Sequence, residues 1–176
     1  AFAGGEGFYQ LGEVRRLRGD VEGAFAAFAK ARTFGIEPQP GEALLRCSQG
    51  DSEAAWAELR VALAAADRLS RMRLLRGAVE IALARGDLDE AEQHCTDLAA
   101  GAATFGTPGF KAWAAHARGA LLVRRGRHAD ALEVLSTALR EYRVQQSRYE
   151  TAEVYDWMAL AHRGMGAEDA ARADEA

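Results

Sequence analysis

Residues 83–91 read Leu83-Ala84-Arg85-Gly86-Asp87-Leu88-Asp89-Glu90-Ala91 and predict a joint between two helices. Gly86 can take the left-handed backbone conformation that ends a helix at little cost, and Arg85 places a positive charge where the helix dipole is negative. Asp87 then predicts an N-cap for the next helix, whose first turn carries further acidic residues. Ala91 lies one turn into that helix, where a small side chain lets two helices approach closely.

The same joint recurs along the chain. Its glycines are separated by 31, 36, 40 and 40 residues and are Gly19, Gly50, Gly86, Gly126 and Gly166. An alanine follows each glycine by five positions, at Ala24, Ala55, Ala91, Ala131 and Ala171. A helical hairpin that repeats at such a period along a whole sequence is the signature of a solenoid.

Composition favours an all-α fold. Alanine, leucine, arginine and glutamate dominate, and the 176 residues include only three prolines. β-Branched residues are scarce, so helices are favoured over strands. Hydrophobic residues make up 49% of the chain, which suffices for a continuous core.

The spacing predicts one repeat array over residues 1–176. Two breaks rich in glycine and proline, 34–41 and 105–109, cannot lie inside helices and therefore separate units. The expected units are residues 8–34, 41–67, 69–104, 109–145 and 148–176, with the last unit truncated. Because the chain begins without methionine and stops in a predicted helix, we expect it to be a fragment of a larger protein.

Charge and residue chemistry exclude several classes of function. A formal net charge of −4 argues against direct nucleic-acid contact by this segment. No apolar run approaches 18 residues and no signal peptide is evident, so we expect a cytoplasmic protein with no membrane contact. Cys47 and Cys95 are expected to be buried, reduced thiols.

The sequence predicts no enzyme, metal site or cofactor. His94, His116, His128 and His162 show no pair at i,i+4 and no acidic or cysteine partner at ligand spacing. No phosphate-binding glycine loop, nucleophile elbow or Ser/His/Asp order is present.

The joints share further residues at fixed distances from their glycines. The first unit carries Phe8, Gly12, Ala24, Phe28 and Ala31, and the fourth carries Gly119, Ala131, Leu135 and Ala138. This pattern resembles the tetratricopeptide repeat over nearly the whole chain. The resemblance implies a right-handed α-solenoid of about five tetratricopeptide-like helix-turn-helix hairpins.

A narrower resemblance concerns residues 37–46, which read Glu37-Pro38-Gln39-Pro40-Gly41-Glu42-Ala43-Leu44-Leu45-Arg46. This segment and the 40-residue units resemble the repeat region of bacterial LuxR-type transcriptional regulators. The resemblance implies a sensory or scaffolding segment that regulates transcription only within the full-length protein, whose helix-turn-helix is expected after Ala176.

The tetratricopeptide resemblance also implies where ligands bind, because the first helix of each unit lines the concave groove of such arrays. Carried onto this chain, the binding residues are Tyr9, Glu13, Arg73, Arg76, Glu80, Trp113, His116, Glu153 and Asp156. Such a groove suits a mixed-charge peptide or an acidic effector held by Arg73 and Arg76 and stacked on Trp113. In the structural alternative, Trp113 packs against the third unit, and the arginines pair with Glu80 or Glu153.

A cluster of arginines at the start of one predicted helix requires an explanation of its own, because the helix dipole disfavours cations there. Its members are Arg68, Arg71, Arg73 and Arg76. Either acidic neighbours or an anionic partner accounts for them.

Two hypotheses about function follow from these patterns. In the first, the chain is a non-catalytic module that binds a protein, a peptide or a small effector. In the alternative, the array mediates self-association into a homo-oligomer without a separate ligand.

Overall fold

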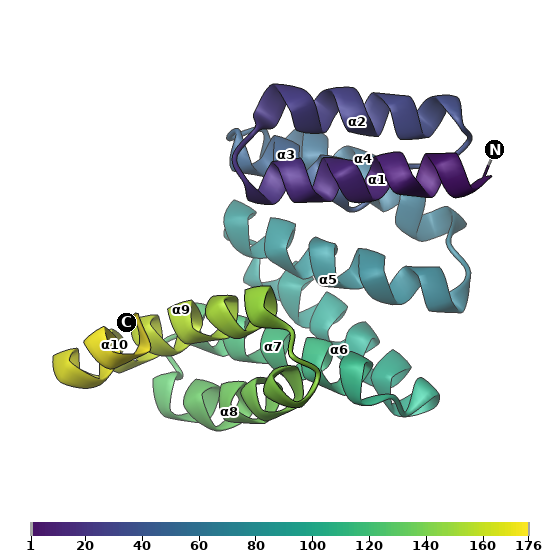
Figure 1. The fold of residues 1–176 in the computed structure, drawn as a ribbon. Helices are drawn as coiled ribbons and strands as arrows, with labels where there is room; N and C mark the ends of the chain where they lie inside the picture. The colour runs from purple at the N-terminus through teal and green to yellow at the C-terminus, as the bar shows by residue number, and fades with distance from the viewer. Residues whose placement is uncertain (1, 176) are drawn as a thin grey trace. The chain divides into compact units, whose positions relative to one another are not determined.

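A computed structural model describes residues 2–175, and these residues form ten α-helices and no strand (Figure 1). The helices fall into two compact units, Ala1–Arg85 and Gly86–Ala176. The first unit holds α1 (Phe2–Leu17), α2 (Val21–Thr33), α3 (Gly41–Ser48), α4 (Ser52–Ala65) and α5 (Arg68–Arg85). The second holds α6 (Leu88–Phe105), α7 (Pro108–Arg124), α8 (His128–Val144), α9 (Arg148–Gly164) and α10 (Glu168–Asp174). The predicted all-α fold is confirmed.

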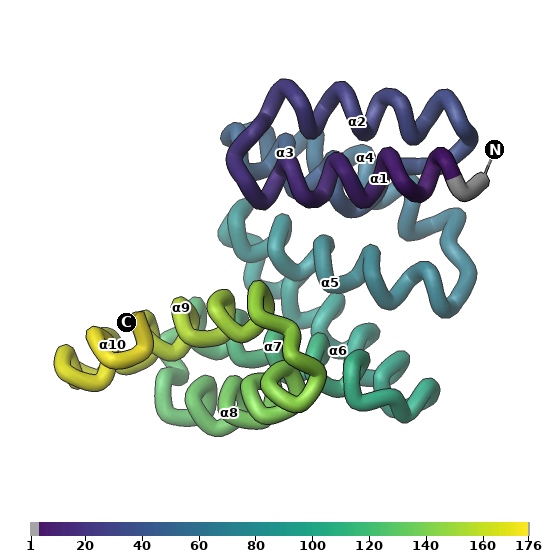
Figure 2. Tube along the Cα trace, viewed as in Figure 1, coloured from purple at the N-terminus to yellow at the C-terminus, as the bar shows by residue number. Residues whose placement is uncertain are grey.

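All five predicted joint glycines have positive φ angles, as helix-ending residues require. The angles run from +73° at Gly126 to +89° at Gly50. Figure 2 lets the reader follow the trace from helix to helix through these joints. The acidic cap predicted at Asp87 is confirmed, and Asp20 and Asp51 cap their helices in the same way. Each of the three side chains accepts a hydrogen bond from a backbone N–H three residues later.

The alanine that follows each joint glycine is fully buried in every copy. Ala24, Ala55, Ala91, Ala131 and Ala171 all have 0% exposure. The helices of a hairpin also meet at a glycine. A Cβ on Gly12 would lie 2.5 Å from Cδ1 of Phe28, and a Cβ on Gly119 would lie 2.5 Å from Cγ of Leu135. Both pairs occupy the same two positions relative to their joint glycines. The two helices of the first predicted repeat (8–34) and those of the fourth (109–145) therefore pack in the same way at this point.

Packing within each unit has the pattern of a helical array. In the first unit, α1 packs on α2 and α3 packs on α4, while α3 also contacts α1 and α5. In the second unit, α7 packs on α8 and α9 packs on α10, while α7 also contacts α9. Neighbouring hairpins are joined mainly where the second helix of one meets the first helix of the next, at α4–α5, α6–α7 and α8–α9, and less extensively through their first helices. The handedness of the array and its division into five repeats remain predictions.

The predicted break at residues 34–41 is buried only in its second half, whereas Phe34, Gly35 and Glu37 are exposed. Its Pro38, Gln39 and Pro40 have lost nearly all contact with solvent, and the peptide bond between Gln39 and Pro40 is cis. Pro40 lies against α5, where a Cβ on Gly77 would come within 2.6 Å of its own Cβ. This connection places the backbone oxygen of Gln39 beside Arg73 of α5, where the candidate site lies.

Candidate binding site

Two of the predicted groove residues of the first unit, Tyr9 on α1 and Arg73 on α5, contact each other. Tyr9 is only 3% exposed and packs against Phe28, with ring centroids 5.9 Å apart. The guanidinium carbon of Arg73 lies 4.8 Å from the centroid of the Tyr9 ring, within the range of a cation–π contact. The same guanidinium donates a hydrogen bond from Nη2 to the backbone oxygen of Gln39, at 3.4 Å. We call Tyr9, Gln39 and Arg73 the Arg73 site.

Arg73 itself remains accessible to solvent. Across residues 2–175 it forms no ion pair with a carboxylate; its contacts are the ring and the carbonyl just described. A guanidinium carries five N–H donors, and one carbonyl uses only one of them. The structure therefore orients the Arg73 guanidinium against the Tyr9 ring, and most of its N–H donors make no hydrogen bond to the residues described.

Glu13, the nearest predicted acidic residue of α1, is already engaged. Its two carboxylate oxygens accept hydrogen bonds from Arg16, at 3.0 and 3.2 Å. Burial first, and then the charge of Glu13, raise the pKa of Tyr9 to about 12. The phenol therefore stays neutral below that pH, and its ring provides a stable face for Arg73.

Two other members of the arginine cluster, Arg71 and Arg76, have partners within residues 1–85. Arg71 donates to the backbone oxygen of Leu63 at 2.7 Å, and Arg76 lies 3.8 Å from the carboxylate of Glu80. An acidic residue, Asp67, precedes the first residue of α5. Its carboxylate accepts hydrogen bonds from the backbone of Leu69 and from Ser70. The hydrogen bonds from Ser70 are the main reason why the pKa of Asp67 is lowered.

These contacts decide between the two explanations for the arginine cluster, one residue at a time. The backbone and an acidic neighbour account for Arg71 and Arg76, as the structural alternative expected for the Arg76–Glu80 pair. This explanation applies neither to Arg73 nor to Arg68, which is exposed at the first position of α5.

The predicted groove residues of the second unit lie differently. His116 is only 7% exposed and faces Tyr142, with Nδ1 at 3.4 Å from the phenol oxygen. Trp113 is half-buried, contacts Phe110 with centroids 5.3 Å apart and the two rings tilted by 56°, and packs on the core. On α9, Glu153 is half-buried and Asp156 is exposed. His116 therefore supports the core, and a groove in this unit remains a prediction.

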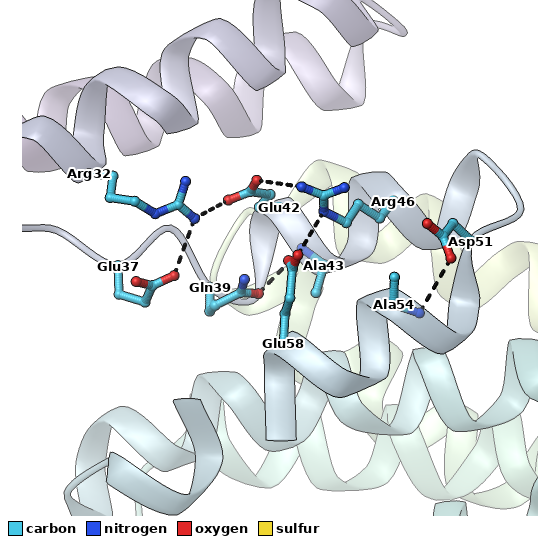
Figure 3. Close-up of polar contacts among 9 residues, drawn as sticks. All are labelled: Arg32, Glu37, Gln39, Glu42, Ala43, Arg46, Asp51, Ala54 and Glu58. Atoms are coloured by element: carbon cyan, nitrogen blue, oxygen red, sulfur yellow. Dashed lines mark hydrogen bonds and ion pairs between the residues drawn. The ribbon is translucent and has the colours of Figure 1, made fainter. Parts of the chain in front are cut away.

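Sequence reasoning missed the most buried charge of the chain, Glu42 at the start of α3. Only 5% exposed, Glu42 lies between two guanidinium groups (Figure 3). Its Oε2 is 2.5 Å from Nη2 of Arg32, and its Oε1 is 3.2 Å from Nη2 of Arg46. Glu37 and Glu58 extend the network, as the outer partners of Arg32 and Arg46 respectively. We call these five side chains the Glu42 network.

The geometry of the Glu42 network indicates a structural role. It connects α2, the segment between α2 and α3, α3 and α4, so it fixes the hairpin of α3 and α4 to its neighbour. Arg46 also stacks over the ring of Phe25 at 5.4 Å. The sequence signal available was the i,i+4 spacing of Glu42 and Arg46, while the partner Arg32 lies beyond a break that contains two prolines.

The second unit has a corresponding charge cluster, centred on Glu92 of α6. Its two carboxylate oxygens lie 2.5 Å from Arg118 and 2.6 Å from Arg125. The hydrogen bond from Arg118 is the main reason that the pKa of Glu92 is lowered. This cluster attaches α6 to α7.

The cysteines and histidines give no indication of chemistry. Both cysteines are free, but only Cys95 is buried, whereas Cys47 is half-buried. Burial raises the pKa of Cys95 to about 12 and also raises the pKa of Cys47. Within residues 2–175, His, Cys, Asp and Glu side chains nowhere gather in the group of three that a metal ion would need. None of the described helices combines the length and apolar character needed to cross a membrane.

The fold and the Arg73 site thus define an all-helical array that presents one oriented, accessible cation in its first unit. Comparison of the chain with protein-family models, with curated proteins and with solved structures found no match. The resemblance to tetratricopeptide repeats and to LuxR-type regulators therefore remains a prediction.

Proposed function

We propose that this chain is a non-catalytic binding module that recognises an acidic peptide or acidic effector through Arg73. The observation that supports the proposal is the position of Arg73, which is stacked on a buried tyrosine, fixed by the carbonyl of Gln39 and accessible to solvent. A guanidinium fixed in this way loses little conformational entropy on binding, and its planar fork matches a carboxylate.

The magnitudes favour a real contribution to affinity. Exposed ion pairs usually contribute little, because two long side chains must be ordered to form them. Here the structure has already ordered one of the two. A hydrogen bond to a charged group is worth about 1.5–3 kcal/mol, so loss of the guanidinium should weaken binding about 10- to 100-fold.

A displayed library of peptides rich in Asp and Glu tests the proposal. Peptides selected on the wild-type chain would be measured by fluorescence anisotropy against Arg73→Ala, Arg73→Lys and Arg60→Ala. Arg60 is an exposed arginine of the same unit and serves as the matched control. We expect a loss of about 10- to 100-fold for Arg73→Ala, a smaller loss for Arg73→Lys and none for Arg60→Ala. Equal binding by Arg73→Ala and Arg60→Ala would exclude the site.

The resemblance to LuxR-type regulators supports a further part of the proposal, that the module is the sensory or scaffolding segment of a bacterial transcriptional regulator. A cytoplasmic location would follow. Reading the coding sequence beyond Ala176 tests this part, since the proposal requires a helix-turn-helix domain in the same protein.

One observation favours the alternative of self-association. Leu11, Val14 and Leu17 of α1 are 39%, 46% and 44% exposed and lie three residues apart. Light scattering over a range of concentrations separates the two hypotheses. A dimer that Val14→Glu converts to a monomer would support self-association, whereas a monomer at every concentration would exclude it.

A further inference from the structure

One face of α5, in the first unit, presents a cation at one end and an anion at the other. Helical spacing places Arg73, Arg76 and Glu80 within about 60° of one another around the axis of α5. Glu80 follows Arg73 by about two turns, so the two residues lie about 10 Å apart along that axis. Both are exposed, whereas the side chain of Arg76, 3.8 Å from the carboxylate of Glu80, is only 19% exposed. A ligand on this face therefore meets Arg73 and Glu80 first.

Helix α3 lies along the same stretch of α5. Gln39, just before α3, accepts a hydrogen bond from Arg73 through its backbone oxygen. Cys47 lies in the last turn of α3, and burial first, and then the charge of Glu80, raise the pKa of its thiol. Arg73 is therefore near the start of α3, and Glu80 is near its end.

An apolar side chain, Leu44, lies in the middle of α3 between these two ends. A Cβ built on Gly41 would lie 3.0 Å from Cδ of Glu13 on α1, whereas Cys47 lies near Glu80 of α5. Helical spacing directs Leu44 between these two directions, and the residue is half-buried. The surface beside α5 thus has a positive end, an apolar middle and a negative end.

From this arrangement we infer that the peptide bound by Arg73 also carries a basic residue, three positions from its acidic residue, which pairs with Glu80. The acidic peptide of the proposed function, on which this inference rests, is then recognised at both ends of the face. In a polyproline II segment, residues three apart point the same way and lie about 9 Å apart, which matches the spacing of Arg73 and Glu80. The two intervening residues lie beside Leu44, where an apolar side chain fits.

Glu80 has the capacity for this second partner. A carboxylate offers about four lone-pair sites, and 44% of the Glu80 side chain is exposed although Arg76 lies beside it. Because the new pair is also exposed to solvent, the basic residue should strengthen binding only about two- to fivefold. Arg73 therefore supplies most of the affinity, and Glu80 selects among acidic peptides.

A displayed library with one fixed glutamate and random flanking residues, selected on the 176-residue chain, tests the inference. We expect lysine and arginine to be enriched three positions from the glutamate on the wild type, and aspartate and glutamate to be enriched there on Glu80→Lys. Glu22→Lys, at an exposed position of α2, changes the net charge equally and should keep the wild-type pattern. Identical patterns for the wild type and Glu80→Lys would overturn the inference.

Fluorescence anisotropy of one selected peptide separates this inference from the proposed function. Replacing the peptide's basic residue with glutamine should weaken binding about two- to fivefold on the wild type and have no effect on Glu80→Gln. Equal weakening on both chains would exclude the pair with Glu80, and a loss of binding by Arg73→Ala would then leave the proposed function standing. Binding that is unaffected by Arg73→Ala would refute both.

Discussion

At the scale of single residues, the alanine after each joint glycine decides how closely two helices approach. Ala131 has no exposed surface and lies in the core of the second unit, packed with α7 and α9. A larger side chain at such a position must push helices apart, because protein interiors are close-packed. Five buried alanines in equivalent positions indicate that small size, rather than hydrophobicity alone, is required there.

Ala131→Leu should lower the free energy of unfolding by about 1–3 kcal/mol, and Ala24 and Ala91 should behave alike. Ala129→Leu, two residues away on the exposed side of α8, is the control and should change stability by less than about 0.5 kcal/mol. Urea denaturation measures both. Equal stability of Ala131→Leu and Ala129→Leu would mean that the repeat register is wrong.

Two glycines of α1 should respond to alanine with opposite signs. Nothing lies within 4 Å of a Cβ built on Gly7, so Gly7→Ala should stabilise the chain by about 0.8–1 kcal/mol through helix propensity. At Gly12 the same Cβ meets the Phe28 ring, and the overpacking cost of about 1–3 kcal/mol exceeds that gain. Thermal melting of the two variants gives the signs, and stabilisation by Gly12→Ala would contradict the close approach of α1 and α2.

At the scale of elements, charge clusters fix helices that the joints alone leave unattached. The network around Glu42 attaches the short α3 to its neighbours, and the cluster around Glu92 attaches α6 to α7. The two carboxylates differ in burial, since the side chain of Glu42 is 7% exposed and that of Glu92 is 33% exposed. Loss of the more buried charge is therefore expected to be the more costly.

Glu42→Gln should lower stability by about 1–3 kcal/mol, because it leaves Arg32 and Arg46 beside a neutral group. Glu37→Gln removes only the exposed partner of Arg32 and should cost less than about 0.5 kcal/mol. Denaturant unfolding of both variants provides the comparison. A cost of Glu42→Gln no greater than that of Glu37→Gln would contradict a structural role for the buried carboxylate.

The Glu92 cluster predicts a pH dependence. Because Arg118 and Arg125 lower the pKa of Glu92, its contribution is present above the pKa of an unfolded glutamate, about 4.3, and is lost as the pH falls through the lower folded value. With screening by solvent taken into account, Glu92→Gln should cost about 0.5–1 kcal/mol at neutral pH, and the difference from the wild type should shrink below about pH 4. Glu133→Gln, at an exposed position of α8, should show no such convergence in the same pH series.

At the scale of the whole molecule, the chain divides into two compact units, Ala1–Arg85 and Gly86–Ala176. The first unit has a cluster that includes Tyr9, Phe28 and Leu45, and the second has one that includes Leu135, Tyr142 and Val154. In repeat proteins each element is stabilised by its neighbours, so a unit that contains several packed helices can be stable by itself.

We expect residues 86–176, expressed alone, to keep their helical circular dichroism and to unfold in one cooperative thermal transition. The core of this unit is supplied by α7, α8 and α9, all of which lie within the segment. Tyr142→Ala is the control variant, since it empties the centre of that core and should abolish the transition. A broad, non-cooperative melt of the unmodified segment would show that its core is insufficient.

Helix α1 begins at Phe2, six residues before the predicted unit 8–34, and Pro108 and Gly109 of a predicted break lie in α7. The sequence by itself did determine where the five joints lie and which small residues are buried beside them. These features follow from local energetics: a glycine with positive φ, an acidic cap and a proline break act over a few residues, so they can be read one joint at a time. The same reasoning predicted the all-α fold and the pairing of Arg76 with Glu80 in the structural alternative.

Only the tertiary structure decided which side chains meet across helices that are distant in the chain. Arg73 stacks on Tyr9, 64 positions earlier, and Glu42 is buried between arginines from two different helices. His116, predicted to line a groove, turned out to face Tyr142 in the core. A helical residue can point to a groove or to the core with a small rotation of its helix, and that rotation is set by the packing of all neighbouring helices together rather than by the residue's own sequence neighbourhood.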